Sequence, residues 1–223
     1  MSKRRLIRFF GVGLLPLWVF QFAWAYGQPE MHEHHEGRCG AAMHMAGDEH
    51  AAHRAALKDT RYSVSNKDYT IPDVELIDKN GKKAQLQAIL DTDEPVALNF
   101  IFTTCTTICP VMTATFAQMQ RQLGDTAGKV RLVSISIDPE YDRPDVLKAY
   151  AEKFHAGENW AFLTGDSKDI IDVLQSFDSF GGSKMNHRPV TLLKKPGGAE
   201  WIRIDGLASG KNLAQEITAR LFN

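Results

Sequence analysis

The sequence predicts an α/β fold over residues 61–223, with a central mixed sheet flanked by helices. Residues 96–102 form a short, mostly apolar run rich in β-branched and aromatic residues. Such a run is typical of a strand that helices cover on both sides. Residues 130–137 repeat this pattern, and a segment of helical length follows each run. Crossovers of that length indicate that these strands are parallel. About 160 residues are enough for one core and one domain.

A hairpin and a short helix are expected before the first buried strand. Residues 73–77 and 84–86 are predicted to pair around the turn Asp78-Lys-Asn-Gly81-Lys. The Asn-Gly step supplies the positive φ angles that a tight turn requires. Residues 86–90 then predict a short helix.

Strands and helices continue to alternate after the second buried strand, because apolar residues recur there at helical spacing. The expected elements are a helix at 143–155, a strand at 160–163, a helix at 167–177, a hairpin of 190–193 with 201–204, and a closing helix through Leu221. Trp160, Trp201 and the phenylalanines are expected in the core, since aromatic side chains supply much of a protein's buried area.

Two cysteines lie where the first buried strand meets the next helix. Cys105 falls in the connecting loop, and Cys109 precedes Pro110, which suits a first helical turn because that turn needs no backbone donor. A helix N-terminus favours a thiolate, so both cysteines are expected to be unusually acidic. A cysteine pair in this position is the thioredoxin-like arrangement. The apolar face of the helix is expected to contain Val111, Met112, Phe116, Met119 and Leu123.

The cysteine spacing leaves two chemistries open. If the helix begins near Cys105, a separation of four residues brings both sulfurs onto one face. They would then be close enough for a disulfide or for sharing one metal ion.

A third candidate, His187, lies in the polar loop 178–189 that leads into the strand at Val190. In a thioredoxin-like topology this loop passes over the cysteine corner, so the imidazole is expected to face Cys105 and Cys109. Two thiolates and one imidazole suit Cu(I), and they accept Cu(II) with an added water. Met185 is a weaker candidate ligand and is expected to pack as an apolar plug.

The first 25 residues predict export. Four basic residues and no acidic residue precede an apolar run that ends Phe-Ala-Trp-Ala25, which is typical of a cleaved signal peptide. A retained membrane anchor is the alternative, because residues 9–26 approach the roughly 18 residues that span a bilayer. Removing the four cations takes the formal charge from −1 to −5. The expected location is the periplasm or the outer face of the cytoplasmic membrane, and the mildly acidic mature chain indicates no nucleic-acid partner.

Residues 26–60 predict a flexible arm, because they contain few large apolar residues. Six of the eight histidines fall between positions 32 and 53, beside Cys39 and three methionines. Imidazole, thioether and thiolate are together the ligands of copper, so the arm is interpreted as a transient metal-gathering segment. The three methionines are Met31, Met43 and Met45.

Three motifs resemble the Sco/SenC family of copper proteins involved in cytochrome c oxidase assembly, over nearly all of residues 62–223. The motifs are Phe102-Thr-Thr-Cys105-Thr-Thr-Ile-Cys109-Pro110, Ser136-Ile-Asp138-Pro139-Glu-Tyr-Asp142-Arg-Pro144, and His187 before the penultimate hairpin. The resemblance implies a thioredoxin fold that binds one copper through Cys105, Cys109 and His187. It also implies delivery of copper or electrons to the oxidase copper-site subunit, or exchange with another copper chaperone.

The resemblance further implies that Asp138 and Asp142 shape the loop beside the cysteines, and turn and capping roles are expected of them. Thr107 stands where the family often has an acidic residue. Pro189 resembles the proline that faces the thiols of redox thioredoxins.

Two functions therefore remain open. The first is an exported copper chaperone, which the three-residue separation of the cysteines favours because it leaves room for an ion. The second is a thiol-disulfide oxidoreductase that keeps a partner's copper-site cysteines reduced, with Cys105 and Cys109 as the redox-active, catalytic pair. A peroxide-reducing variant ranks third.

Overall fold

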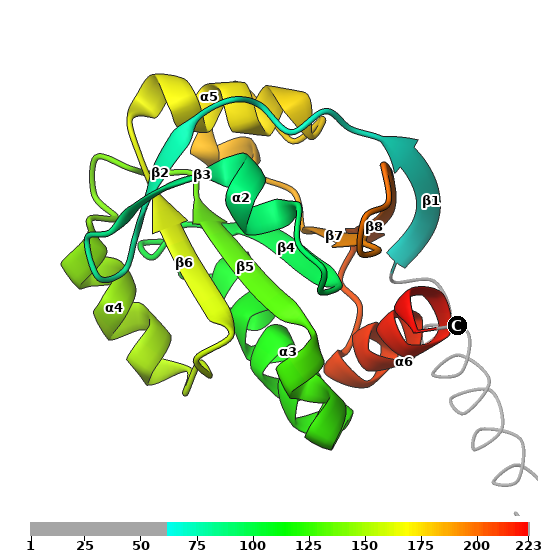
Figure 1. The fold of residues 1–223 in the computed structure, drawn as a ribbon. Coiled ribbons are helices and arrows are strands. Elements are labelled where there is room, and N and C mark those ends of the chain that lie inside the picture. The colour runs from blue at the N-terminus through cyan, green and yellow to red at the C-terminus, as the bar shows by residue number, and fades with distance from the viewer. Residues whose placement is uncertain (1–61, 223) are drawn as a thin grey trace, which may run out of the picture. The chain divides into compact units, whose positions relative to one another are not determined.

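The computed structural model describes residues 62–222, which form an eight-stranded mixed sheet with helices on both faces (Figure 1). The strand order is β1-β8-β7-β4-β5-β6-β2-β3. The strands are β1 (Tyr62–Asp68), β2 (Glu75–Asp78), β3 (Lys83–Gln85), β4 (Val96–Ile101), β5 (Arg131–Ser136), β6 (Trp160–Thr164), β7 (Val190–Lys194) and β8 (Glu200–Gly206). The helices are α2 (Leu86–Leu90), α3 (Ile108–Leu123), α4 (Pro144–Lys153), α5 (Ser167–Ser176) and α6 (Gly210–Leu221), with 3-10 turns η1 (Gly124–Lys129) and η2 (Lys184–Asn186).

The centre of the sheet confirms the prediction of parallel buried strands. β4 pairs in parallel with β5, and β5 with β6, while β7 joins the other edge of β4 in the antiparallel direction. Every residue of β4 is buried, because helices cover both faces of the sheet at this strand. Because β4 and β5 are parallel, their carboxyl ends lie side by side.

Two apolar layers hold the helices to the sheet. One layer joins the sheet to α3, α4 and α6, and the other joins it to α2 and α5, as Figure 1 shows by the two groups of helices on opposite sides of the strands. Trp160 belongs to the first layer and Trp201 to the second, and both are fully buried. Their predicted core positions are confirmed.

Three details differ from the sequence-based predictions. β1 was not predicted, because its residues are mostly polar and exposed; it forms by pairing antiparallel with β8. Val111 was expected in the core but is 47% exposed. The buried stripe of α3 runs instead through Cys109, Met112 and Phe116, whose spacing of three and four residues leaves position 111 on the outer side. Phe180 and Phe222 are likewise exposed, although the phenylalanines were expected in the core.

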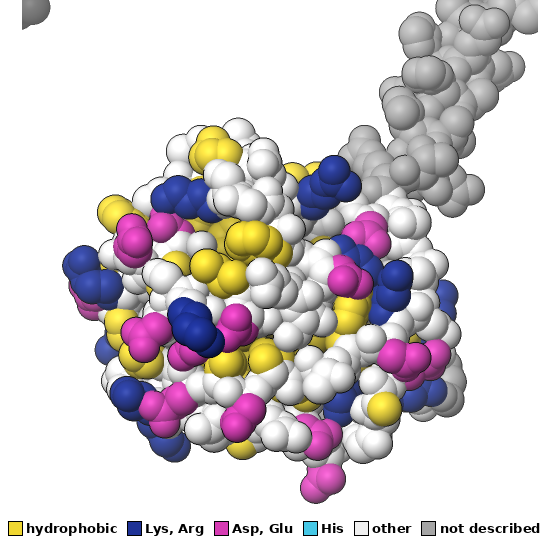
Figure 2. Space-filling model, turned by 90° about the horizontal axis from the view of Figure 1, so that it is seen from above, with side chains coloured by type: hydrophobic (Ala, Val, Ile, Leu, Met, Phe, Trp, Pro, Cys, Tyr) yellow, Lys and Arg dark blue, Asp and Glu magenta, His cyan; other side chains and the backbone are white. Residues whose placement is uncertain are grey.

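The proposed signal or anchor (1–25) and the arm (26–60) lie outside the described residues. Within residues 62–222, none of the helices has the length and apolar character needed to cross a bilayer. On the face shown in Figure 2, hydrophobic side chains lie between basic and acidic side chains, so charges of both signs are interspersed there. Such mixing produces no strong field of one sign on this face.

Candidate functional site

The two cysteines meet beyond the carboxyl end of β4. α3 begins at Ile108, so Cys105 lies outside the helix and Cys109 lies in its first turn. The backbone N–H of Cys109 donates to Cys105 Sγ at 3.4 Å. Both residues are free thiols, and Cys109 is fully buried whereas Cys105 keeps 9% of its surface exposed. Cys105 is therefore the sulfur that faces solvent.

The two thiols differ strongly in acidity. Burial opposes ionisation of Cys105, but hydrogen bonds from the backbones of Cys109 and Thr107 and from the Thr107 hydroxyl outweigh it and lower the pKa of Cys105 to about 7. Burial, reinforced by the neighbouring Cys105, raises the pKa of Cys109 to about 12. The expectation of an acidic Cys109 is wrong, because loss of solvent outweighs the helix N-terminus at that depth.

A buried carboxylate fixes the start of the segment that carries both cysteines (residues 103–109), which we call the cysteine loop. Asp142 is fully buried and accepts hydrogen bonds from the backbone N–H and the hydroxyl of Thr103. It also accepts one from the Ser136 hydroxyl at 2.6 Å. These contacts connect the ends of β4 and β5. The expectation that Asp142 shapes the loop near the cysteines agrees with this geometry, although its side chain does more than cap a turn.

His187 immediately follows η2, in the loop that enters β7. Its Nε2 lies 3.0 Å from the backbone carbonyl of Phe100. A carbonyl oxygen only accepts, so Nε2 carries the proton and Nδ1 keeps its lone pair. Burial lowers the pKa of His187, which favours the neutral ring. Metal-ligating histidines usually have this arrangement, with one nitrogen held by an outer partner and the other available.

Cys105 and His187 line one pocket of about 480 Å³, which we call the thiol pocket. Its other lining residues include Phe102, Thr107, Ile108 and Met185. Among residues 62–222, no three His, Cys, Asp or Glu side chains are gathered as a metal-binding group. The donors nevertheless fit a soft ion, since they are a readily ionised thiol, a second thiol in contact with it and a neutral imidazole. Bringing these three donor atoms around one ion requires side-chain movement.

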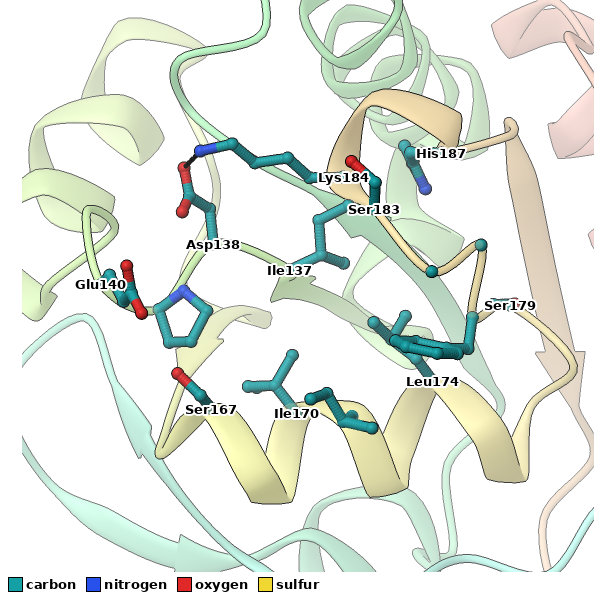
Figure 3. A pocket seen from close by; sticks show the side chains of 15 residues that line it. Ile137, Asp138, Glu140, Ser167, Ile170, Leu174, Ser179, Ser183, Lys184 and His187 are labelled. Carbon is teal, nitrogen blue, oxygen red and sulfur yellow. Dashed lines mark hydrogen bonds and ion pairs between the residues drawn. The ribbon is translucent and has the colours of Figure 1, made fainter.

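An ion pair joins the segment that carries His187 (residues 179–189), which we call the histidine loop, to the loop that follows β5. Lys184 reaches from η2 to Asp138, with Nζ and Oδ2 2.5 Å apart (Figure 3). The Thr104 hydroxyl also lies 3.5 Å from the same oxygen. Asp138 therefore contacts both the segment that carries Cys105 and the segment that carries His187. The Lys184 ammonium also lies 5.8 Å from the centroid of the Phe102 ring.

Sequence reasoning missed Lys184. A lysine in a polar loop carries no local signal, because its partner Asp138 is 46 residues earlier in the chain. The turn predicted at Asp138 does exist, since the backbone carbonyl of Asp138 accepts from the N–H groups of Tyr141 and Asp142. The carboxylate of Asp138 has the additional task of holding Lys184.

A mixed sheet with a dithiol between its first parallel strand and the next helix defines a thioredoxin-like domain. The SCO1/SenC family model matches residues 63–221, and the chain belongs to that family. A SCO1 protein homolog of Bacillus subtilis is 34% identical over 137 residues, which cover 60% of this chain and 64% of the relative. The chain thus spans less than two thirds of that relative's length.

Solved structures share the fold. BsSco, a member of the Sco family of cytochrome c oxidase assembly proteins in which a disulfide switch is identified, superposes with a TM-score of 0.58 at 28% identity, over 70% of this chain and 95% of its own. Arabidopsis thaliana ScoI with copper bound has a TM-score of 0.57 at 22% identity, over 67% and 97% respectively. The thioredoxin-like fold predicted from the sequence is confirmed.

Proposed function

We propose that this chain is an exported copper chaperone that holds one copper ion through Cys105, Cys109 and His187 and delivers it to the copper site of a respiratory oxidase. The supporting observation is that His187, far from the cysteines in sequence, lines the same pocket as Cys105 and keeps Nδ1 available. Membership of the SCO1/SenC family and the copper-bound state of a protein with the same fold support the choice of metal.

The two thiols would contribute differently to binding. Cys105 is about half ionised near pH 7, so it is ready to receive Cu(I). Cys109 is protonated when no metal is bound, and the ion must displace its proton. Binding should therefore release protons and become tighter as pH rises.

The cellular setting of this proposal rests on the N-terminal sequence and the family. Residues 1–25 would export the chain to the periplasm or hold it at the outer face of the membrane, and residues 26–60 would gather copper for the core site. The partner would be the copper-site subunit of the oxidase or another copper chaperone. A chain shortened to begin at Thr60 should bind copper at the core but take it up more slowly; an unchanged uptake rate and stoichiometry would reduce the arm to a tether.

A titration with Cu(I) under reducing, oxygen-free conditions tests the central claim. The reduced protein should bind close to one tightly held ion at the core, whereas the oxidised protein should not. His187→Ala should weaken binding while leaving a reducible Cys105–Cys109 bridge. Unchanged affinity in that variant removes His187 from the ligand set, and absence of tight binding to the reduced wild-type protein rejects the chaperone.

A second function is favoured by the unequal acidities of the thiols. The Cys105 thiolate would attack a disulfide formed by a partner's copper-site cysteines, releasing one partner thiolate. Cys109 would lose its proton and attack Cys105 in the mixed disulfide, which releases the second partner thiol and leaves this chain oxidised. A disulfide-bonded peptide with two such cysteines is the direct substrate. Its reduction without copper would support this function, and Cys109→Ser should accumulate the mixed disulfide.

A further inference from the structure

Met185 is the most exposed of the large hydrophobic side chains that the structure describes, with 79% of its surface accessible. The two other methionines among residues 62–222, Met112 and Met119, are buried in the core. The expectation that Met185 packs as an apolar plug is wrong. Burial therefore does not explain a thioether at this position.

The backbone around Met185 is held while its side chain remains in solvent. The Met185 N–H donates to Ser183 Oγ at 3.3 Å, at the start of η2. On one side of it Lys184 is tied to Asp138, and on the other His187 is tied to the Phe100 carbonyl. In Figure 3, Lys184 points from η2 toward Asp138 and His187 lies beyond it on the same loop.

Three side chains that can bind copper share the thiol pocket. Met185, Cys105 and His187 all line it, and they offer a thioether, a thiolate and an imidazole. Cys109 has no exposed surface. An ion that arrives from solution or from another protein must therefore meet donors at the mouth of the pocket before it can reach Cys109.

We propose that Met185 is the entry and exit ligand of the copper site. Its thioether binds arriving Cu(I) together with Cys105, and the ion then passes to Cys109 and His187. A thioether suits this step because it is a soft ligand with no proton to lose, so it neither competes with protons nor adds charge that would hold the ion. The inference rests on the proposed copper function and adds to it a route for ligand exchange.

The first test stops the transfer at its intermediate stage. The full chain with Cys109→Ser, labelled with carbon-13 in the methionine methyl groups, is titrated with Cu(I) without oxygen. The Met185 signal, identified by its loss in Met185→Leu, should shift as Cu(I) is added, whether or not the signals of Met31, Met43 and Met45 in the arm shift as well. The Met112 and Met119 signals serve as internal controls and should not move.

The second test measures rates in otherwise wild-type protein. Met185→Leu keeps the size and apolar character of the side chain but removes its sulfur. Uptake of Cu(I) and its release to a competing chelator should both slow several-fold. Phe180→Leu is the matched control, because Phe180 is an exposed hydrophobic residue of the same loop that does not line the thiol pocket. Its exchange rates should equal those of the wild type.

The outcomes separate this inference from the proposed function. If the wild-type protein binds no Cu(I) tightly, the copper function fails and the entry step fails with it. If the wild type binds one ion but Met185→Leu exchanges it at the wild-type rate, only the entry ligand is rejected. The kinetic result decides even if Cys109→Ser does not fold.

Discussion

The cysteine loop (residues 103–109) and the histidine loop (residues 179–189) hold the two halves of one candidate site by different means. The cysteine loop is fixed from beneath, because the buried Asp142 binds Thr103 and Ser136. The histidine loop is mostly exposed and is joined to the neighbouring strands and loops through Lys184 to Asp138 and through His187 to Phe100. The comparison indicates that the part of the site with Cys105 and Cys109 is preformed, whereas the part with His187 is more easily displaced.

This difference suits a site that must both hold and release an ion. Buried, fully bonded polar networks are rigid, whereas segments with few buried contacts open at lower free-energy cost. Exchange with a partner would therefore begin on the side of the histidine loop. Three measurements can test that division.

The largest effect on stability is expected from disrupting the hydrogen bonds to the buried Asp142 carboxylate. Asp142→Asn replaces one acceptor oxygen with an amide that faces hydrogen-bond donors, so the free energy of unfolding should fall by about 2–3 kcal/mol. Urea denaturation of the wild-type protein and of Asp142→Asn measures this difference in the free energy of unfolding. Asp172→Asn, at an exposed ion pair on α5, is the matched control and should change little. A loss no larger than that of the control would show that the cysteine loop is not fixed by Asp142.

A smaller effect is expected from the ion pair that holds the histidine loop. Lys184→Gln removes the charge that binds Asp138, so His187 should be less well positioned and Cu(I) affinity should fall by about tenfold, as for other outer partners of a ligand. Competition with a Cu(I) chelator measures this.

Stability should change less than in Asp142→Asn, because Lys184 is partly exposed. Lys168→Gln removes another lysine that is paired with an aspartate, but one in the first turn of α5 that does not line the thiol pocket, and should leave copper affinity unchanged. Equal affinities for Lys184→Gln and Lys168→Gln would show that the ion pair does not position the imidazole.

The sequence predicted the parts of this architecture that depend on local patterns. The short helix at residues 86–90 and the turn at Gly81 agree with the structure, because the spacing of Leu86 and Leu90 and the positive φ of Gly81 determine them locally, although Asn80 does not adopt the second positive φ that was expected. β1 was missed, since its seven residues are ordered by pairing with β8 rather than by their own pattern.

The candidate site shows the same division. The cysteine motif predicted where Cys105 and Cys109 lie, and the expected path of the loop before Val190 predicted where His187 lies. The high pKa of Cys109 and the partners of Asp142 and Lys184 depend on burial and on contacts between distant segments. Helix-terminus reasoning treated the two cysteines as equals, because sequence spacing contains no information on depth.

The smallest expected effect concerns the acidity of Cys105. The groups that lower its pKa to about 7 belong to Thr107 and Cys109, so alkylation by iodoacetamide should rise about tenfold per pH unit below pH 7 and level off above it. Lys184→Gln should leave that midpoint where it is, since the largest causes of the shift, which are burial and the hydrogen bonds of Thr107 and Cys109, lie within the cysteine loop. Mass spectrometry of the alkylated peptides, which also separates the slow reaction of Cys109, gives the midpoint for each protein. A midpoint near that of an ordinary thiol, or one that moves in Lys184→Gln, would mean that the cysteine loop is not independent of the histidine loop.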